Sequence, residues 1–214
     1  MSNNAFSSIL EKRKADIVTA VIRLVDKVGI TGLTTKLIAK EVGFVEGALY
    51  KHVDSKTGVF HIILDASAQS IEMVAGDIAG RGLAPTEALI AWFDFVVSFL
   101  EDYPGIYRIL FSDGLYAGDR TLFDKFKGCM LDVKSRMRAV IEKGMESGEF
   151  RPDINPETMA VMYLGMIHTT FTLWTVFEER SRSYKETARP YFEGYMRSLC
   201  LPAGKTSSGE VSNG

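Results

Sequence analysis

Residues 33–56 read Leu-Thr-Thr-Lys-Leu-Ile-Ala-Lys-Glu-Val-Gly-Phe-Val-Glu-Gly-Ala-Leu-Tyr-Lys-His-Val-Asp-Ser-Lys. The stretch predicts a short helix, a tight turn at Gly43, and a second short helix that ends near His52. Apolar residues recur on one face of both helices, at Leu37, Ile38, Val42 and Leu49. Hydroxyls, a tyrosine and cations are left on the other face: Thr34, Thr35, Lys36, Tyr50, Lys51, His52 and Lys56. Because such a face suits the phosphate-lined groove of a duplex, the stretch predicts DNA binding by a helix-turn-helix.

Upstream of this stretch, apolar residues recur at the spacing of one helix face, at Ile17, Val21, Leu24, Val25 and Val28. They predict a helix that ends at Gly29. Taken together, residues 12–65 resemble the DNA-binding domain of the tetracycline-repressor (TetR) family of transcriptional regulators. The resemblance combines paired threonines, Ile-Ala, a turn glycine, Gly-Ala-Leu-Tyr-Lys-His and a downstream Ser-Lys at family-like spacing. Residues 146–157 (Glu-Ser-Gly-Glu-Phe-Arg-Pro-Asp-Ile-Asn-Pro-Glu) are similar to a common helix connection in the family's C-terminal domain.

Two positions depart from the family pattern. Val45 stands where a serine often opens the recognition helix, and the loss of that cap costs on the order of 1 kcal/mol. Glu46 in the first turn offsets part of this cost through the helix dipole. Gly58 stands where an acidic partner for a Ser55 cap would be favourable. Neither change removes a cation from the predicted DNA-facing surface.

The resemblance implies a role for each matching position in a dimer that places one recognition helix in each of two successive major grooves. Thr35, Tyr50 and Lys56 would bind phosphate. The residues at or near base edges would be Lys36, Glu46, Gly47, Ala48, Lys51 and His52. Lys51 can donate to guanine, and Glu46 can accept from cytosine.

Plainer interpretations stay open for several of these residues. Tyr50 could cap the core of the small domain, and His52 could be an exposed or structural histidine. Residues 12–14 (Lys-Arg-Lys) form either a solvated helix face or a basic arm that enters a minor groove.

Charge is distributed unevenly along the 214 residues. The net charge is −2, but residues 1–61 carry nine Lys/Arg against six Asp/Glu. A basic N-terminal module on an acidic remainder fits a nucleic-acid partner. The apolar run at 89–100 is interrupted by Asp94 and is too short to span a bilayer, so no membrane partner is expected. No secretory signal is recognised, and Cys129 and Cys200 are expected to be reduced thiols in a cytoplasmic protein.

The pattern is helical throughout, which predicts an all-α fold. We expect an N-terminal three-helix helix-turn-helix DNA-binding domain over residues 1–54 and a helical ligand-binding and dimerisation domain over 55–201. The tail at 202–214 has almost nothing to bury and is expected to be disordered. The expected helices cover 9–29, 34–42, 46–52, 55–79, 86–102, 104–111, 119–147, 156–179 and 184–200.

The C-terminal domain is rich in methionine and aromatic residues at helical spacing. Such stripes usually form core, but facing helices of this composition also enclose cavities for apolar small molecules. The TetR resemblance implies an effector pocket here, with Tyr107, Tyr163, His168 and Thr170 as polar handles. The candidate ligand-binding residues are Trp92, Phe95, Phe99, Tyr103, Tyr107, Phe111, Phe126, Met130, Met137, Tyr163, Met166, Thr170 and Trp174. The sequence leaves both interpretations open.

Residues 156–200 are the candidate dimer element, because two apolar helices per subunit can form a symmetric four-helix interface. The candidate interface residues are Thr169, Thr172, Leu173, Val176, Phe177, Tyr191, Tyr195 and Leu199. Trp174 has two open roles, since it could close the ligand cavity or belong to this interface.

The sequence carries no recognisable catalytic or metal-binding motif. The three histidines form no His-Glu-x-x-His pattern, and no Gly-x-x-x-x-Gly-Lys-Ser/Thr loop is present. We therefore expect no catalytic residues, no cofactor and no metal. The predicted function is a homodimeric repressor that releases operator DNA when an apolar or amphipathic effector binds. The alternatives are a DNA-binding factor that is constitutive or regulated by a protein partner, and a helical enzyme that uses the methionine-lined cavity.

Overall fold

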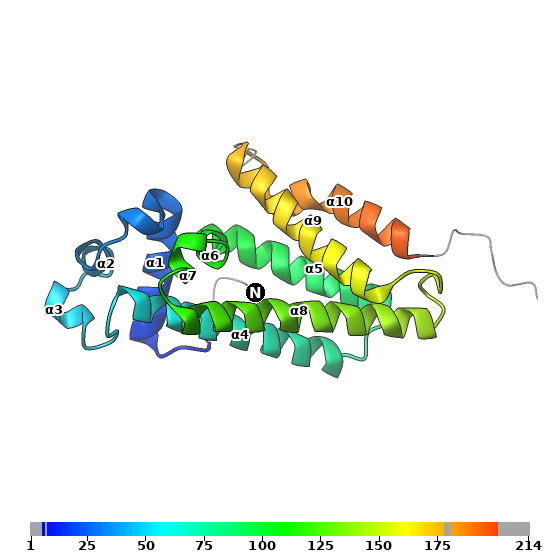
Figure 1. Ribbon diagram of the computed structural model, residues 1–214, viewed down its shortest axis with the longest axis horizontal. Helices are drawn as coiled ribbons and strands as arrows, with labels where there is room; N and C mark the ends of the chain where they lie inside the picture. The colour runs from blue at the N-terminus through cyan, green and yellow to red at the C-terminus, as the bar shows by residue number, and fades with distance from the viewer. Residues whose placement is uncertain (1–5, 7, 178–180, 201–214) are drawn as a thin grey trace, which may run out of the picture.

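The computed structural model describes residues 6, 8–177 and 181–200, and within these ranges the regular secondary structure is all helical (Figure 1). The predicted all-α class is confirmed. The helices are α1 (Lys12–Gly32), α2 (Thr35–Glu41), α3 (Glu46–Leu49), α4 (Lys56–Gly80), α5 (Pro85–Asp102), α6 (Pro104–Leu110), α7 (Asp113–Tyr116), α8 (Arg120–Glu146), α9 (Pro156–Val176) and α10 (Tyr184–Leu199). The tail predicted at 202–214 lies outside the described residues.

Three elements differ from the expected ranges. The recognition helix α3 is a single turn of four residues, and residues 50–52 continue as a turn instead of a helix. The short helix α7 was not predicted, because four residues are too few to show helical periodicity. In α1, Gly29 has a φ of 71°, so the regular helix breaks where the sequence predicts its end, before one more turn to Gly32.

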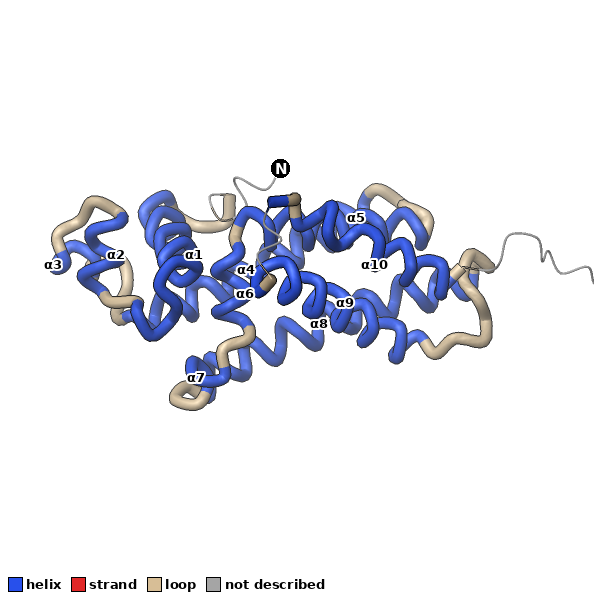
Figure 2. The backbone as a smooth tube through the Cα atoms, turned by 90° about the horizontal axis from the view of Figure 1, so that it is seen from above, coloured by secondary structure: helices blue, strands red, loops and turns tan. Residues whose placement is uncertain are grey.

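We call α1–α3 the head and α4–α10 the body. Figure 1 shows α4, α5 and α8 side by side along the long axis, with α9 and α10 against one side of them. Helices α2 and α3 form one end of the molecule, and α1 stands across that end between them and the body (Figures 1 and 2). The long helix α4 begins at Lys56 beside the head and runs to Gly80 in the body.

Head and body meet in a closely packed seam. A Cβ added to Gly105 of α6 would lie 1.9 Å from the carbonyl oxygen of Ile22 in α1, so only glycine permits this approach. Phe6, before α1, is 1% exposed and packs edge-on against Tyr103 at a ring distance of 5.0 Å. Arg108 of α6 pairs with Asp26 of α1 at 3.6 Å. A change in the position of α6 must therefore move α1 or disrupt this packing.

Ion pairs connect α4 to α8 and to the turn before it. His61 contacts the Asp119 carboxylate at 2.9 Å, and Lys125 contacts Asp65 at 2.6 Å. Arg136 of α8 also contacts Glu72 of α4. These pairs are partly exposed, so they fix the alignment of the two helices more than they add stability. No described helix is both long enough and apolar enough to cross a membrane.

Candidate functional sites

The outer end of the head is shaped by a cap and a turn. The hydroxyl oxygen of Thr34 accepts the N–H of Leu37 at 3.1 Å and so caps α2. Gly43 has a φ of 72°, the left-handed conformation that glycine adopts without strain. Val45 precedes α3 and makes no side-chain cap bond, as an aliphatic residue there predicts. This backbone sets α3 just beyond the end of α2.

Most of the predicted DNA-facing residues lie on the surface. Thr34, Lys36, Glu46, Gly47, Tyr50 and Lys51 are exposed, and Thr35, Ala48, His52 and Lys56 are half-buried. Tyr50 is 49% exposed, so Leu49 and not Tyr50 fills the core beneath α3. No atom lies within 4 Å of the place where a Cβ on Gly47 would stand, so a nucleotide can approach this backbone closely.

Two of the residues predicted to contact DNA form a hydrogen bond with each other in the structure. The Thr35 hydroxyl donates to the Glu46 carboxylate at 2.6 Å and ties α2 to the first turn of α3. A phosphate at Thr35 would have to compete with Glu46 for this hydroxyl. The bond also fixes Glu46 in the first turn of α3, where its charge favours the helix dipole.

Lys56 is partly engaged as well. Its Nζ donates to the carbonyl oxygen of Leu33 at 3.2 Å and connects the start of α4 to the loop before α2. An ammonium group carries three donors, so this bond leaves room for a phosphate contact. Lys56 therefore holds the head against α4, a structural role that the sequence did not predict.

An aromatic stack on the head was also missed. The guanidinium of Arg13 lies 5.6 Å from the centre of the Phe44 ring, and Phe44 stacks on His52 at 5.7 Å. His52 thus has a structural contact in addition to its position near the predicted base edges. The sequence offers one signal, because Phe44 directly follows the turn glycine Gly43; its half-burial is seen only in the structure.

Comparison with known protein families gives a match for both parts of the chain. Residues 17–62 match the model of bacterial regulatory proteins of the tetR family, and residues 85–188 match the tetracyclin repressor-like C-terminal domain. The chain belongs to the TetR family. It is a DNA-binding transcriptional regulator with the all-α, two-part fold expected of that family.

Individual relatives of this TetR-family regulator are distant. The nucleoid occlusion factor SlmA of Vibrio atlanticus is 24% identical over 157 residues, which cover 72% of this chain and 80% of that protein. The ketosteroid transcriptional regulator KstR2 of Mycobacterium tuberculosis superposes with a TM-score of 0.74 at 17% identity, over 90% of this chain and 97% of that one. FadR of Bacillus subtilis, solved in complex with stearoyl-CoA, gives 0.70 at 18% identity, over 86% and 97%. These two solved structures show the shared fold.

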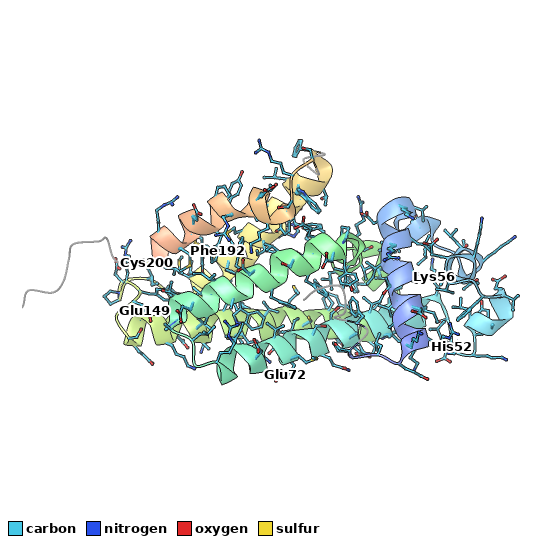
Figure 3. All side chains as sticks on the ribbon, turned by 180° about the vertical axis from the view of Figure 1, so that it is seen from behind. His52, Lys56, Glu72, Glu149, Phe192 and Cys200 are labelled. Atoms are coloured by element: carbon cyan, nitrogen blue, oxygen red, sulfur yellow. The ribbon has the colours of Figure 1, made fainter. Side chains whose placement is uncertain are left out.

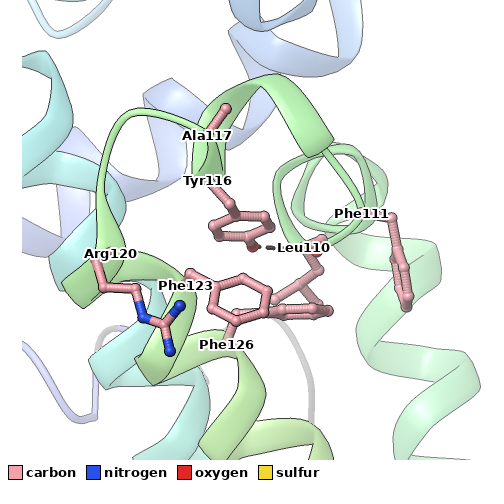
Figure 4. A pocket seen from close by; sticks show the side chains of 7 residues that line it. All are labelled: Leu110, Phe111, Tyr116, Ala117, Arg120, Phe123 and Phe126. Carbon is pink, nitrogen blue, oxygen red and sulfur yellow. Dashed lines mark hydrogen bonds between the residues drawn. The ribbon is translucent and has the colours of Figure 1, made fainter.

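Three open hollows stand out in the described part of the body. The aromatic hollow, about 490 Å³, is lined by Leu110, Phe111, Tyr116, Ala117, Arg120, Phe123 and Phe126 (Figure 4). The hairpin hollow, about 610 Å³, is lined by Ala75, Ile78, Ala79, Gly82, Leu83, Pro85, Ala88, Trp92, Arg136, Ala139, Val140, Lys143, Glu146 and Ser147. The seam groove, about 810 Å³, is lined by Ser8, Ile9, Ser70, Met73, Val74, Asp77, Ile78, Arg81, Ala91, Asp94, Phe95, Ser98 and Phe99.

The thirteen predicted ligand-binding residues do not gather around any one of these hollows. Phe111 and Phe126 line the aromatic hollow, Trp92 the hairpin hollow, and Phe95 and Phe99 the seam groove. The other predicted residues line none of the three: Tyr103, Tyr107, Met130, Met137, Tyr163, Met166, Thr170 and Trp174. Several of them are core, and their faces are covered by neighbouring helices.

The predicted polar handles are occupied or enclosed. The Tyr107 hydroxyl lies 2.6 Å from a ring nitrogen of His168 and 2.9 Å from the Thr172 hydroxyl, and partial burial raises its pKa. The Thr170 hydroxyl lies 3.1 Å from that of Tyr184. Tyr163 is 1% exposed, and burial holds its pKa well above the ordinary value. These groups organise the packing of α9 against α6 and α10.

The predicted dimer residues divide between two faces. Thr169, Phe177 and Tyr191 are exposed, and Thr172 and Leu173 are half-buried; the side chain of Val176 is not among those described. Tyr195 and Leu199 were wrongly expected on the outer face. Tyr195 is 7% exposed and donates to the Met159 carbonyl at 2.9 Å, and Leu199 is fully buried. On α9, Val161 and Met162 are 52% and 51% exposed and were missed by the sequence analysis.

The cysteines and potential metal ligands add no further site. Cys129 and Cys200 are free thiols, and burial raises the pKa of Cys129 to about 11, so this thiol stays protonated near neutral pH. Within the part of the chain that the structure describes, no group of three or more His, Cys, Asp or Glu residues is placed to hold a metal ion.

Proposed function

We propose that this regulator is a homodimeric repressor that binds operator DNA with α2 and α3 and releases it when a small molecule binds the body. The observation that carries the proposal is the seam, because α6 of the body touches α1 of the head through Gly105 with no room for a side chain. Rearrangement around a bound effector would therefore be transmitted to the head. The effector must prefer one arrangement of the seam over the other, since equal affinity for both would shift nothing.

Dimerisation through α9 and α10 is supported by the apolar residues that the single chain leaves outside. Val161, Met162 and Tyr191 are each about half exposed, and Gly165 on α9 would let a second helix approach closely. A two-fold arrangement of this face would join two heads in one assembly, as binding to two successive major grooves requires.

The chemistry of the effector is supported by two similar solved structures. FadR of Bacillus subtilis was solved with stearoyl-CoA, and KstR2 of Mycobacterium tuberculosis is described as a ketosteroid regulator. Both point to apolar or amphipathic molecules, in agreement with the largely apolar hollows of this body. The proposal needs no catalytic residue, cofactor or metal, and it places the regulator in the cytoplasm with chromosomal DNA.

The DNA-binding part is tested with fluorescently labelled fragments selected from genomic DNA. Tyr50→Ala should weaken binding to all fragments, because it removes a phosphate contact, whereas Lys51→Ala should change the sequence preference. Lys143→Ala, an exposed lysine at the far end of α8, serves as the matched control. Unchanged anisotropy curves for both head variants would overturn the proposed docking.

The dimer is tested by sedimentation equilibrium. Met162→Glu should produce monomers and lower operator affinity more than tenfold, because a desolvated carboxylate at an interface is strongly unfavourable. Leu131→Glu changes a residue of similar exposure on α8 and should leave the dimer intact. Equal behaviour of the two variants would show that the interface lies elsewhere.

A second candidate is a DNA-binding factor regulated by a protein partner. The match to the nucleoid occlusion factors SlmA favours it, since it spans most of both chains. The two candidates differ in one measurement. A repressor of the first kind loses its operator when apolar or amphipathic small molecules are titrated into the complex, and a partner-regulated factor keeps it.

A further inference from the structure

The seam groove is where the body and the segment before α1 come together. Its two long walls are α4 and α5, which Figure 3 shows next to each other in the view from behind. Its third wall is Ser8 and Ile9, which lie only a few residues before α1 begins at Lys12. At about 810 Å³ the groove has the volume of a small-molecule site.

The apolar part of the groove lies toward the head. Met73 and Val74 contribute from α4, and Phe95 and Phe99 from α5, with Ile9 beside them. The lining residues of α4 run from Ser70 to Arg81, which at the helical rise corresponds to about 16 Å. The groove is therefore long enough for an extended hydrocarbon and not only for a compact ring.

The charges of the groove are already neutralised within the chain. Arg81 pairs with Asp77 at 3.5 Å, and Asp94 pairs with Lys185 at 2.8 Å and lies 3.8 Å from Arg189. The other polar residues of the lining are the serines Ser8, Ser70 and Ser98, which carry neutral hydroxyls. An ionic ligand would lose its hydration and would have to compete with these ion pairs for a countercharge, so the groove favours an uncharged molecule.

Two short connections lead from the groove to α1. The first passes through Phe99, whose ring lies 5.4 Å from that of Tyr103, the residue before α6 and Gly105. The second is the N-terminal segment, in which the Phe6 carbonyl accepts the N–H groups of Ile9 and Leu10 at 3.2 and 2.9 Å. The Phe6 ring also lies 5.7 Å from Phe99, so both connections meet at the head end of the groove.

We propose that the seam groove is the effector site of this regulator, that its ligand is an elongated, uncharged amphipathic hydrocarbon, and that the segment carrying Ser8 and Ile9 reports occupancy to α1. This assignment rests on the proposed function. The ligand would lie between α4 and α5, with the segment before the head as one wall. The aromatic hollow, with Arg120 at its edge, is the competing location.

The ligand class is tested with three probes of one chain length: n-decanol, decanoate and decylammonium. Binding to the full chain is followed by isothermal titration calorimetry and by the shift in melting temperature. Decanol should bind at least about tenfold more tightly than either ion, because the ions must be desolvated beside paired charges. Equal or tighter binding of decanoate or decylammonium, or no binding of any probe, would overturn the proposal.

The location is tested by three alanine-to-phenylalanine substitutions, one in each hollow. Ala91→Phe in the seam groove should reduce decanol binding at least tenfold, and Ala117→Phe and Ala139→Phe should leave it unchanged. Ser98→Phe fills the same groove from another position and guards against a folding defect in the first variant. Loss of binding in Ala117→Phe or Ala139→Phe, with both groove variants normal, would assign the site to another hollow.

The wall formed by the N-terminal segment is tested by Ile9→Ala. This change should weaken decanol binding by about fourfold or more, the factor that one buried methylene contributes. Unchanged affinity would show that the segment is not part of the site. Operator release is measured separately: decanol that binds without releasing DNA would leave the groove assigned and contradict the effector-responsive repressor.

Discussion

The head and the body bury apolar residues at the same helical spacing, yet they leave different things uncovered. In the head, α3 buries only Leu49, and its neighbours Tyr50 and Lys51 stand free at the tip of the molecule. In the body, several predicted functional residues are part of the core, and the candidate sites are gaps between helices. A surface site can therefore be predicted from the residues that lie outside the buried apolar stripe of a helix. A cavity depends on how closely the faces of neighbouring helices pack, and the sequence pattern of one helix does not show this.

The largest expected effect tests whether head and body are separable at all. Gly105→Ala places a methyl group against the Ile22 carbonyl, so the α1–α6 contact must open. We expect a loss of about 3 kcal/mol in the free energy of unfolding, the upper end for an overpacked site. Urea denaturation followed by circular dichroism gives this value directly.

The matched control for that prediction is Gly128→Ala in the middle of α8. A Cβ there meets no atom within 4 Å, so helix propensity should raise stability by up to about 1 kcal/mol. If both variants shifted the urea midpoint in the same direction, the seam would not be the close contact described above.

The sequence predicted the turn and the exposed residues of the head because these features are local. Thr34 caps α2 and Gly43 makes the turn, and both act within a few residues of themselves. The exposure of Tyr50 follows from its position next to Leu49. The sequence does not reveal contacts between segments that are far apart along the chain. Lys56 binds the carbonyl of Leu33, 23 residues earlier, and no spacing rule connects those positions.

In the body, overlapping stripes made the prediction ambiguous. Tyr191, Tyr195 and Leu199 share one helical spacing, and so do the residues that α10 buries: Tyr184, Ala188, Phe192, Tyr195 and Leu199. The structure selects the second stripe because Phe192 stacks on Phe93 of α5 at 4.1 Å. Which stripe faces inward depends on α5, so α10 alone could not decide it.

Lys56→Met tests the connection between head and body, because Lys56 begins α4 of the body and binds the carbonyl of Leu33 in the head. Removing the bond to the Leu33 carbonyl should cost about 1.5 kcal/mol of stability, as for a hydrogen bond from a charged group. If the same ammonium also contacts phosphate, the slope of log affinity against log salt should fall by about one. Lys40→Met, an exposed lysine of α2, should change stability by less than about 0.5 kcal/mol. A stability loss with an unchanged salt slope would leave Lys56 a purely structural residue.

Tyr163→Phe tests whether the body tolerates polar groups only where they are paired. The Tyr163 hydroxyl is buried and has no hydrogen-bond partner among the described residues. Its removal should therefore stabilise the protein by about 1 kcal/mol.

The control is Tyr184→Phe, because the Tyr184 hydroxyl donates to the Ile167 carbonyl at 3.0 Å. Loss of that bond and of the contact with the Thr170 hydroxyl at 3.1 Å should destabilise the protein by a similar amount. Shifts of the same sign in the two urea midpoints would mean that hydrogen bonding does not distinguish these tyrosines.

The smallest expected effect concerns Asp119, which caps α8 by accepting the Leu122 N–H at 2.9 Å and also binds His61 of α4. The two hydrogen bonds, with the Leu122 contact the larger, hold its pKa below the ordinary value. The ionised carboxylate thus favours the folded state at any pH above the aspartate pKa of an unfolded chain, about 3.9. That contribution is lost as the pH falls through the lower pKa of the folded protein.

Asp119→Asn keeps a capping oxygen but carries no charge, so its melting temperature should lie below that of the wild type at neutral pH and approach it below about pH 4. His61→Gln, which leaves the cap to Leu122 intact, should retain most of the acid dependence. A constant difference between the Asp119→Asn variant and the wild type at all pH values would show that the charge of Asp119 does not contribute, and that its capping geometry alone holds the turn beside α4.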